Sequence, residues 1–568
     1  MSSNIQIADI FEEIADLLEL KGDNPFKIRA YRKVAANMLS MSDDINKYVK
    51  EDTLTKLPGV GKDLADKIKE ILTTGTLKSY EKLKKSIPKG LLDIMLIQGI
   101  GPKTTKLLYD ELKINSIAKL KKCAQQHKLC KLPHLKEKTE QNILKGIELL
   151  EKISGQMLLS EAIVSAEAVI AYLKKEKYIE KISVAGSTRR MKETIRDIDI
   201  LIASKNPKKA SEAFINMPQV KRVLSHGETK SSIITKQDTQ IDMRIVKPDS
   251  FGAALVYFTG SKTHNIHLRQ LAIKKKLKIN EYGVFSGIKK IAGKTEEEVY
   301  KTVGLESIEP ELREDAGEIE AAKNNKLPEL VSLDDIKGDV HVHSKWSDGV
   351  HSIEEIARAC RQIGYKYVAI TDHSQSLKIA GGLSEKELAK KNKEIDNLNK
   401  KFKDFKILKG VEVDIKQDGT LDYPDTILKD LDVVIIAIHT GFKQSKEIIT
   451  KKILKAMDNK YAHILAHPTG RLLATRQAYG LDMQAILKHA KETNTAIEIN
   501  GNPQRLDLDD INSRTASEMG IKLALTTDTH RLEQLSYMRY AVSVAHRGWL
   551  TKKDILNTHS VPELLKGL

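Results

Sequence analysis

The sequence predicts a multidomain protein with a helical N-terminal part, an α+β middle part and a C-terminal α/β barrel. Three observations lead to this prediction. The chain has 568 residues, and roughly 150 residues per domain gives about four domains. Helical segments joined by short Gly/Pro turns fill the first 150 residues. Beyond residue 337, short apolar strands alternate with amphipathic helices, which is typical of a parallel barrel.

The composition favours a globular protein in a reducing compartment. Hydrophobic residues make up 40% of the chain and charged residues 30%, and no apolar run approaches the roughly 18 to 20 residues that a membrane span needs. The first twenty residues mix acids with apolar residues, unlike a secretory signal. Three cysteines are too few for a disulfide framework. We therefore expect a cytoplasmic protein without a membrane partner.

The charge and the histidines point to two kinds of chemistry. Lys and Arg number 94 against 77 Asp and Glu, a net charge of +17, which favours a polyanionic partner. A lysine-rich composition alone could give the same charge without such a partner. Motifs are therefore needed to decide whether the protein binds a polyanion. Of the 16 histidines, 11 occur from His341 onward, which predicts a separate chemistry in the last two-fifths of the chain.

A repeated turn in the N-terminal part predicts contact with phosphates. Leu57–Ala65 and Ile97–Thr105 both have an apolar residue, then Gly-x-Gly, then a helix, and Leu132–Thr139 is interpreted as a degenerate third copy. Such a turn lets backbone N–H groups converge on an anion at a helix N-terminus. A single copy could be an ordinary tight turn, but tandem copies resemble the helix-hairpin-helix motif. The predicted DNA contacts are Gly59, Gly61, Gly99 and Gly101.

Three aspartates in the middle part predict a magnesium site. Asp197 and Asp199 lie two apart in a predicted strand, Asp197–Ile202, and therefore face the same side. Asp242, in the predicted strand Gln240–Val246, can supply a third carboxylate. Three oxygen ligands suit two Mg²⁺ ions about 3.5 to 4 Å apart, the arrangement used for in-line phosphoryl transfer. The Gly186-Ser187 turn before the strands is typical of nucleotidyltransferases.

At these residues the sequence resembles family X DNA polymerases, over about residues 4–313. The resemblance makes Asp197, Asp199 and Asp242 the catalytic metal ligands and assigns the incoming triphosphate to Gly186, Ser187 and Arg190. It places Tyr257 and Phe258 beside the sugar, within a nucleotide-binding hinge that includes Gly260. Asn265 and Arg269 would contact the base side and the template.

The same resemblance extends to the N-terminal segment and shows some departures. It implies that Lys27 binds a 5′-phosphate and that Lys67 is a Schiff-base amine, although a lysine on a basic helix is usually a solvated charge. Met191 and Arg196 stand where glycines are common, and Lys262 stands where the vertebrate repair polymerase has an acid. These departures concern nucleotide affinity and fidelity.

The C-terminal part places imidazoles and carboxylates at successive strand ends. The predicted strands are Val368–Ile370, Ile407–Val413, Val433–Ile438, Ile464–Leu465, Ala496–Ile499 and Leu523–Leu525. Barrel enzymes keep catalytic residues at this end of the strands. Mixed imidazole and carboxylate ligands suit Mn²⁺, Zn²⁺ or Fe²⁺. The pattern therefore predicts a metal site of its own.

The order of these residues resembles the polymerase and histidinol phosphatase (PHP) domain. All nine ligand positions of that family are occupied, which implies about three metal ions: His341, His343, Asp348, His373, Glu412, His439, His467, Asp528 and His530. Arg471 and Asn500 are candidate phosphate contacts, and His463 is expected in the core or behind the ligands.

These motifs divide the chain into six expected segments. They are a helical lyase-like domain with a helix-hairpin-helix (1–84), fingers with a second hairpin (85–152), a nucleotidyltransferase palm (153–258), a thumb (259–315), a linker (316–336) and a PHP metal-dependent phosphoesterase (337–568). The linker is placed where the acidic stretch from Glu309 to Leu333 contains Pro310 and Pro328.

The leading hypothesis is a gap-filling DNA polymerase of base excision repair with a 3′–5′ exonuclease in the PHP domain. A 3′-phosphatase or abasic-site endonuclease activity is also open. One alternative gives the barrel a small phosphomonoester substrate, and another makes the hairpins and palm a DNA-binding module that recruits the phosphoesterase. The expected partners are gapped or nicked DNA and dNTPs, with two Mg²⁺ in the palm. We expect a monomer, associated with the nucleoid.

Overall fold

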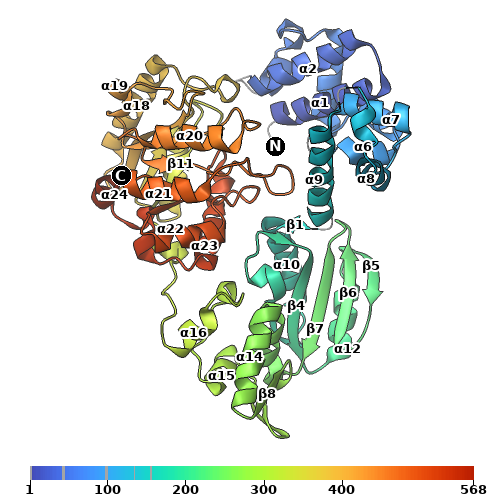
Figure 1. Ribbon diagram of the computed structural model, residues 1–568, viewed down its shortest axis with the longest axis vertical. Helices are drawn as coiled ribbons and strands as arrows, with labels where there is room; N and C mark the ends of the chain where they lie inside the picture. Colours follow the sequence, from blue (N-terminus) through green and yellow to red (C-terminus); the bar gives the residue numbers. More distant parts are fainter. Residues whose placement is uncertain (1–2, 41–44, 96, 98–99, 134, 154–155) are drawn as a thin grey trace. The chain divides into compact units, whose positions relative to one another are not determined.

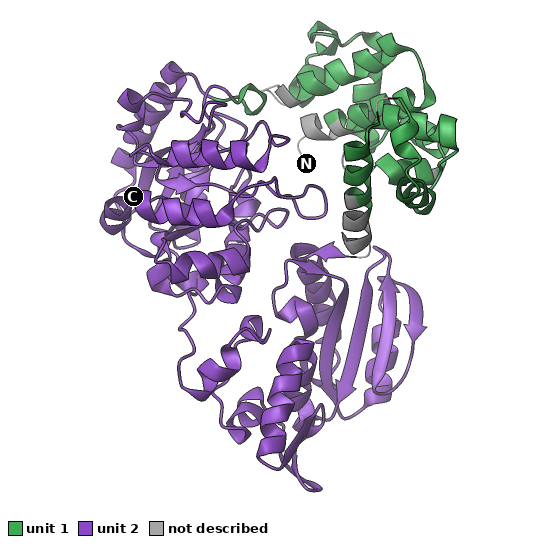
Figure 2. Cartoon of the chain, viewed as in Figure 1, with its two compact units in different colours: residues 1–154, 377–382 green, residues 155–376, 383–568 purple. Residues whose placement is uncertain are grey.

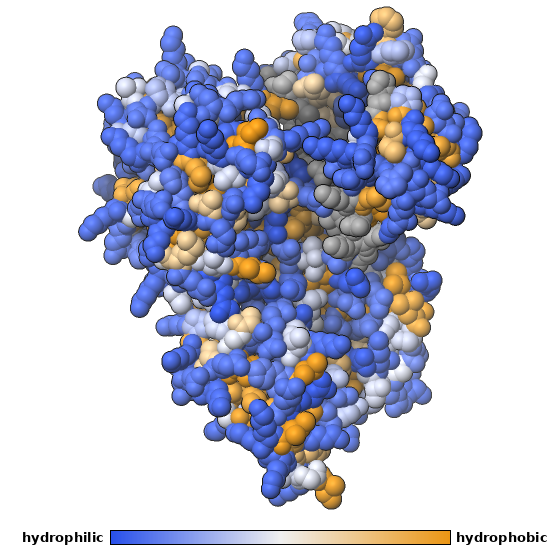
Figure 3. All heavy atoms as spheres, viewed as in Figure 1, coloured by the Kyte–Doolittle hydropathy of each residue, from blue (hydrophilic) through white to orange (hydrophobic). Residues whose placement is uncertain are grey.

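The computed structural model describes residues 3–40, 45–95, 97, 100–133, 135–153 and 156–568. The chain forms two compact units, one of residues 1–154 with 377–382 and one of residues 155–376 with 383–568 (Figure 2). The face drawn in Figure 3 is mainly hydrophilic. In the described part of the chain, no helix is long and apolar enough to cross a membrane.

The first unit is built from helices around one apolar core (Figure 1). Its core includes Phe11, Val34, Ile68 and Leu108. The helices are α1 (Ser3–Lys21), α2 (Pro25–Ser40), α3 (Ile45–Lys50), α4 (Lys62–Thr74), α5 (Lys78–Lys85), α6 (Lys89–Met95), α7 (Pro102–Leu112), α8 (Ile117–Gln125) and α9 (Glu137–Ile153).

The predicted turn repeats share one backbone geometry. Before α4, Val60 N donates to Leu57 O at 3.1 Å and Ala65 N donates to Gly61 O at 2.9 Å. Before α7, the equivalent bonds are Ile100 N to Ile97 O at 3.0 Å and Thr105 N to Gly101 O at 2.9 Å. The third copy repeats the pattern, with Leu135 N to Leu132 O at 3.2 Å and Glu140 N to Lys136 O at 3.1 Å.

The middle part of the chain contains a five-stranded mixed sheet. Its strands lie in the order β2 (Ile179–Val184), β4 (Asp197–Ser204), β7 (Gln240–Val246), β6 (Lys230–Thr235) and β5 (Val220–Ser225). Only β4 and β7 are parallel neighbours, and their register sets Asp199 opposite Asp242. Alternate apolar residues of both strands face a core with α10 (Leu159–Leu173) and α12 (Pro207–Ile215).

Helices and a small three-stranded antiparallel sheet follow the five-stranded sheet, which we call the palm sheet. They are α13 (Phe251–Thr259), α14 (Lys262–Lys274), β8 (Leu277–Asn280), β9 (Gly283–Ser286), β10 (Lys289–Ala292) and α15 (Glu296–Thr302). The stretch expected to be a linker, residues 316–336, includes a short helix. It contains α16 (Glu318–Lys323), whose Ile319 and Ala322, spaced three apart, pack into the core of this region.

The C-terminal part is a nearly closed barrel of seven parallel strands in chain order. Each of the six predicted strands is present, and β11 precedes them. The strands are β11 (Gly338–Val342), β12 (Tyr367–Ile370), β13 (Lys406–Asp414), β14 (Val433–Ala437), β15 (Ile464–Leu465), β16 (Ala496–Asn500) and β17 (Leu523–Thr526). A parallel bridge joins Val342 to Thr529, so the first strand meets the chain that follows the last.

Helices cover this barrel, as the alternation in the sequence predicts. They are α17 (Ile353–Gln362), α18 (Glu385–Lys401), α19 (Asp425–Leu428), α20 (Lys446–Met457), α21 (Met483–Thr493), α22 (Asp510–Glu518), α23 (Met538–Arg547) and α24 (Val561–Gly567). The strand ends that carry the histidines converge inside the ring of strands.

Candidate functional site

The palm sheet brings the three predicted carboxylates to one place. Asp199 on β4 lies directly opposite Asp242 on β7, and Asp197 is two residues earlier on the same face of β4. Asp242 is buried, and Lys230 on β6 approaches it with Nζ 2.8 Å from Oδ2. Gln240 Nε2 donates to the other oxygen of Asp242 at 3.1 Å.

The carboxylates strongly affect one another. Burial, followed by the negative charges of Asp197 and Asp242, raises the pKa of Asp199 to about 7. Burial would also raise the pKa of Asp242, but hydrogen bonds from Lys230 and Gln240 hold it below its usual value. Burial and neighbouring negative charge thus favour a positive ion beside Asp199, and oxygen ligands suit Mg²⁺.

A short helix carries the predicted triphosphate contacts to this cluster. In α11 (Gly186–Arg189), Gly186 has a φ of +63° and its Cα lies against Asp199. A Cβ added to Gly186 would lie 2.2 Å from Asp199 Oδ2, so only glycine fits. Ser187 follows in the same turn, and Arg190 caps it. Arg190 Nη1 donates to Thr259 O at 2.7 Å.

The predicted hinge residues lie at the end of α13, in the turn after it and in α14. Tyr257 and Phe258 contact each other edge to face, with ring centroids 5.1 Å apart. Asn265 Nδ2 donates to Tyr257 O at 2.8 Å and to Gly260 O at 3.0 Å, so its amide nitrogen holds the turn. Arg269 is exposed one turn further along α14. The amide nitrogen of Asn265 is therefore engaged within the turn.

The barrel brings the nine predicted ligands together. Glu412 lies near five of the histidines, with His467 Nε2 2.9 Å from Oε1 and His373 Nδ1 2.9 Å from Oε2. Eight of the nine form three groups whose potential ligand atoms lie within 4.8 Å of one another, and His467 joins them through Glu412: His343, Asp348, His373 and His530; His341, His343 and Asp528; and His373, Glu412 and His439.

Unpartnered ring nitrogens show that the cluster fits metal ions. His341 Nε2 and both ring nitrogens of His343 are buried and have no hydrogen-bond partner within the described chain. A buried nitrogen without a partner is costly. Because these atoms face carboxylates, bound divalent cations would satisfy both. The donor set therefore fits the metal ions that the resemblance implies.

The electrostatics of the barrel also favour cations. Burial alone would lower the pKa of His341, but the carboxylates of Glu498, Glu412 and Asp528 raise it well above its usual value. Burial, assisted by His530 and His373, lowers the pKa of His343 to about 4. The neighbouring acids thus favour a proton on His341, and a metal ion would compete with that proton for the same ring nitrogen.

Two acids behind the ligands were missed from the sequence. Glu498 Oε1 lies 2.6 Å from His341 Nδ1, and Asp414 Oδ1 lies 2.7 Å from His439 Nδ1. A carboxylate on the second ring nitrogen fixes the orientation of a ligating histidine. Asp414 is the last residue of β13, and Glu498 is an acid in the middle of the apolar strand β16; these positions are the signal that could have found them.

Two candidate phosphate contacts in the barrel have other partners. Arg471 Nε donates to Arg505 O at 2.9 Å, and its Nη2 donates to Glu193 in the palm region at 2.7 Å. Asn500 Nδ2 donates to Asp528 Oδ2 at 3.2 Å and is fully buried. Asn500 therefore supports a predicted ligand, and Arg471 joins barrel and palm. Arg505 Nε, 3.4 Å from Asp528 Oδ2, is the nearer cation to the metal cluster.

The N-terminal lysines are held by neighbouring acids. Lys27 is exposed, with Nζ 3.3 Å from Asp23 Oδ2. Lys67 Nζ bonds the Asp63 carboxylate and lies 5.5 Å from the centroid of the Tyr31 ring. Burial would lower the pKa of Lys67, but Asp63 and Tyr31 raise it. An amine must be neutral to attack a carbonyl, so this arrangement does not activate Lys67.

The hairpin glycines differ in what the fold requires of them. Gly59 has a φ of +82°, which favours glycine. Gly61 and Gly101 have ordinary φ values, and no described atom lies within 4 Å of a Cβ added at either position. The fold alone therefore does not require glycine there, as expected if a ligand backbone approaches. Gly99 lies outside the described residues.

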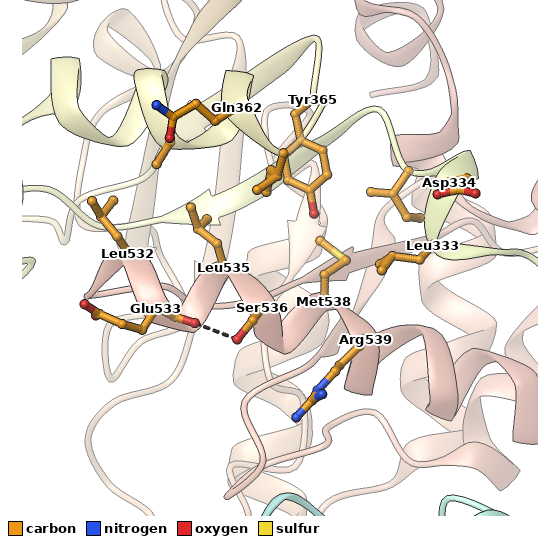
Figure 4. Close-up of a pocket in the computed structure, with 14 residues that line it drawn as sticks. Leu333, Asp334, Gln362, Tyr365, Leu532, Glu533, Leu535, Ser536, Met538 and Arg539 are labelled. Carbon is orange, nitrogen blue, oxygen red and sulfur yellow. Dashed lines mark hydrogen bonds between the residues drawn. The ribbon is translucent and has the colours of Figure 1, made fainter. Parts of the chain in front are cut away.

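A hollow of about 570 Å³ on the barrel is not part of either cluster. Figure 4 shows its lining, which includes Tyr365, Leu532 and Met538 and none of the predicted ligands. The chemistry-bearing residues instead converge at the strand ends, and we place the candidate sites there.

The fold and the two clusters define a nucleotidyltransferase joined in one chain to a metal-dependent phosphoesterase. Family models match in the corresponding places: a helix-hairpin-helix domain at residues 2–77, a SAM-like helix-hairpin-helix tandem at 91–148, a DNA polymerase beta thumb at 254–314 and a PHP domain at 339–502. The chain belongs to the family X DNA polymerases that carry a PHP domain, as the following relatives show.

The chain is 40% identical to the DNA polymerase/3′-5′ exonuclease PolX of Bacillus subtilis over 564 residues, which cover 98% of each chain. It is 25% identical to DNA polymerase lambda of Rattus norvegicus over 345 residues, 55% of this chain and 56% of that one. A probable phosphatase of Thermoanaerobacter matches at 32% identity over 241 residues, 40% of this chain and 94% of that one. The predicted family is confirmed.

Proposed function

We propose that the protein is a DNA-directed DNA polymerase that fills short gaps in base excision repair, and that its barrel is a 3′–5′ exonuclease. The observation that carries this proposal is that the three palm aspartates converge at one place and the nine predicted barrel ligands at another, in a chain that matches PolX over 98% of its length. The binding-module alternative leaves the palm aspartates without a purpose, and a small phosphomonoester substrate gives no reason for joining the barrel to helix-hairpin-helix domains that bind DNA.

In the palm, we assign Asp197, Asp199 and Asp242 to two Mg²⁺ ions, and in the barrel the nine predicted ligands to about three Mn²⁺, Zn²⁺ or Fe²⁺ ions. Metal ions at such sites supply Lewis acidity and activate an oxygen nucleophile. Glu498 and Asp414 orient ligating histidines through their second ring nitrogens.

Side chains around the palm aspartates would bind and orient the nucleotide. Arg190 and Ser187 would hold the triphosphate, since the Arg190 guanidinium can donate to phosphate oxygens in a fixed fork. Tyr257 and Phe258, packed against each other, would form the wall beside the sugar. Asn265 and Arg269 would face the base and template. We propose that the protein binds dNTPs and gapped or nicked DNA. We also propose that it is a monomer and that it is associated with the nucleoid.

Separation of function tests the proposal on one labelled, gapped DNA. Asp197→Ala or Asp242→Ala should abolish primer extension and leave 3′ degradation intact. His341→Ala or Asp528→Ala should do the reverse, and degradation should be faster with Mn²⁺ than with Mg²⁺ because imidazole ligands prefer it.

Two variants control for non-specific effects. Glu180→Ala breaks an exposed 3.1 Å ion pair with Lys205 on the palm sheet, and His489→Ala breaks a 2.9 Å pair with Asp458 on the barrel. Both should keep both activities. If Asp197→Ala removed degradation as completely as His341→Ala does, the assignment of two independent sites would be wrong.

A further inference from the structure

An arginine of the barrel reaches the backbone of the proposed triphosphate-binding residue. Arg547, the last residue of α23, is 8% exposed and donates from Nη1 to the main-chain oxygen of Arg190 at 3.0 Å. Its Nη2 donates to Asp510 on α22 at 2.5 Å. The Asp510 carboxylate thus fixes the guanidinium to the barrel, and the other edge of the guanidinium is directed to the palm.

Glu314 joins the two arginines. Its Oε1 accepts from Arg190 Nε at 2.9 Å and from Arg547 Nη1 at 3.2 Å, and Lys192 Nζ lies 3.6 Å away. Burial would raise the pKa of Glu314, but Arg190, Lys192 and Arg547 hold it below its usual value. The carboxylate is therefore ionised at neutral pH, and it orients both guanidinium groups.

These contacts leave part of the Arg190 side chain available. Nε is bound to Glu314 and Nη1 to Thr259 O, while Nη2 has no hydrogen-bond partner among the described residues. A guanidinium fixed along one edge and free at another loses little conformational entropy when it binds a ligand. The arrangement is preorganised to bind an anion.

We infer that Arg547 is a positioning residue of the polymerase site, holding Arg190 through its backbone and through Glu314 so that the free edge of the guanidinium meets the triphosphate. The inference rests on the proposed role of Arg190 in nucleotide binding. It means that a barrel residue sets the nucleotide affinity of the palm without taking part in degradation.

Another arginine on the same helix provides a matched control. Arg539, near the start of α23, also faces a palm glutamate, with Nη1 3.6 Å from Glu167 Oε1 on α10. The side chains of Arg539 and Glu167 are 42% and 61% exposed. Exposed ion pairs contribute little to stability. Arg539→Ala therefore removes a barrel-to-palm ion pair that does not touch Arg190.

The test is steady-state primer extension on gapped DNA, with KM for dNTP and kcat measured separately and degradation followed without dNTPs. Arg547→Ala should raise KM about tenfold, since a positioned charged hydrogen bond is lost, with kcat, DNA affinity and degradation within about twofold. Arg547→Lys should give a smaller rise in KM, because lysine keeps the positive charge near Glu314 but cannot bind Asp510 and the Arg190 backbone at the same time with a planar guanidinium. Arg539→Ala should change nothing.

A double variant shows whether Arg547 acts through Arg190. Arg190→Ala should raise KM more than Arg547→Ala, and Arg190→Ala with Arg547→Ala should be no worse than Arg190→Ala alone. Glu314→Gln, which keeps size and removes charge, should also raise KM and replaces Arg547→Ala if that variant does not fold.

Different results would overturn the positioning role of Arg547 and the triphosphate-binding role of Arg190. An unchanged KM in Arg547→Ala, an equal rise in Arg539→Ala, or additive effects in the double variant would overturn the role of Arg547 alone. An unchanged KM in Arg190→Ala would overturn the triphosphate role itself, and the positioning role with it.

Discussion

Gly186 offers a sharp test of how the palm carboxylates are placed. In Gly186→Ala, the new Cβ would lie 2.2 Å from Asp199 Oδ2 and 3.1 Å from its Cγ. The residue would also have to keep a φ of +63°, which costs about 1–2 kcal/mol for a residue with a Cβ. The substitution therefore perturbs a predicted metal ligand without changing it.

The expected loss of activity follows from the size of this overlap. To reach an ordinary contact, the Asp199 carboxylate must move by about 1 Å, and a displacement of that size at reacting groups can cost about 100-fold in rate. We expect Gly186→Ala to fold, to lose about 1–2 kcal/mol of stability, and to extend primers about 100-fold more slowly. Degradation by the barrel should be unchanged.

Gly520→Ala controls for backbone strain. Gly520 has a φ of +79° in the barrel, and no described atom lies within 4 Å of an added Cβ. This variant should lose similar stability and keep full extension activity. Thermal unfolding and single-turnover extension measure the two effects. If Gly186→Ala extended primers within about threefold of the parent, the close contact with Asp199 would have no role in catalysis.

Three further predictions concern protons, DNA and the N-terminal lysine. Because the pKa of Asp199 in the folded protein is about 7, above its ordinary value of 3.8, metal-free protein should lose stability as pH rises between these values. Mg²⁺ should restore that stability and Asp199→Asn should flatten the profile; a pH-independent Tm in the metal-free parent would contradict this. Gly61→Ala and Gly101→Ala should fold normally and raise the Kd for DNA of any sequence, whereas an unchanged Kd would leave these turns as plain connections. Asp63→Ala should lower the pKa of Lys67, because Asp63 raises it, and so increase borohydride trapping on abasic DNA at neutral pH. Equal trapping by Lys67→Ala would rule out that amine.

Residues whose position follows from a local period could be predicted from the sequence. The two-residue spacing of Asp197 and Asp199 fixes their shared face, and the parallel pairing with β7 then brings Asp242 opposite. The nine barrel ligands follow from one rule, that parallel strand ends meet at one edge of the barrel. The family resemblance added the identity of each ligand.

Residues that act across the chain could not be predicted in this way. Arg471 follows His467 by four residues and was expected to contact phosphate, yet it bonds Glu193, 278 residues away. The same holds for Arg547 and Glu314. The hydrophobic periodicity of a segment does not predict which residue it contacts in another domain. The acidic stretch before the barrel was expected to be a linker because it contains prolines, yet it includes the helix α16.

The closing pair of strands has a consequence for how the protein is made. His341 and His343 come from β11, whereas Asp528 and His530 follow β17, and the bridge from Val342 to Thr529 joins them only when the last strand is in place. The palm aspartates, by contrast, are all present once residue 242 has been synthesised. A nascent or proteolysed chain that ends before residue 528 would retain every palm carboxylate but lack two of the predicted barrel ligands. Under the proposed assignment of the two sites, such a fragment would extend primers but could not degrade 3′ ends.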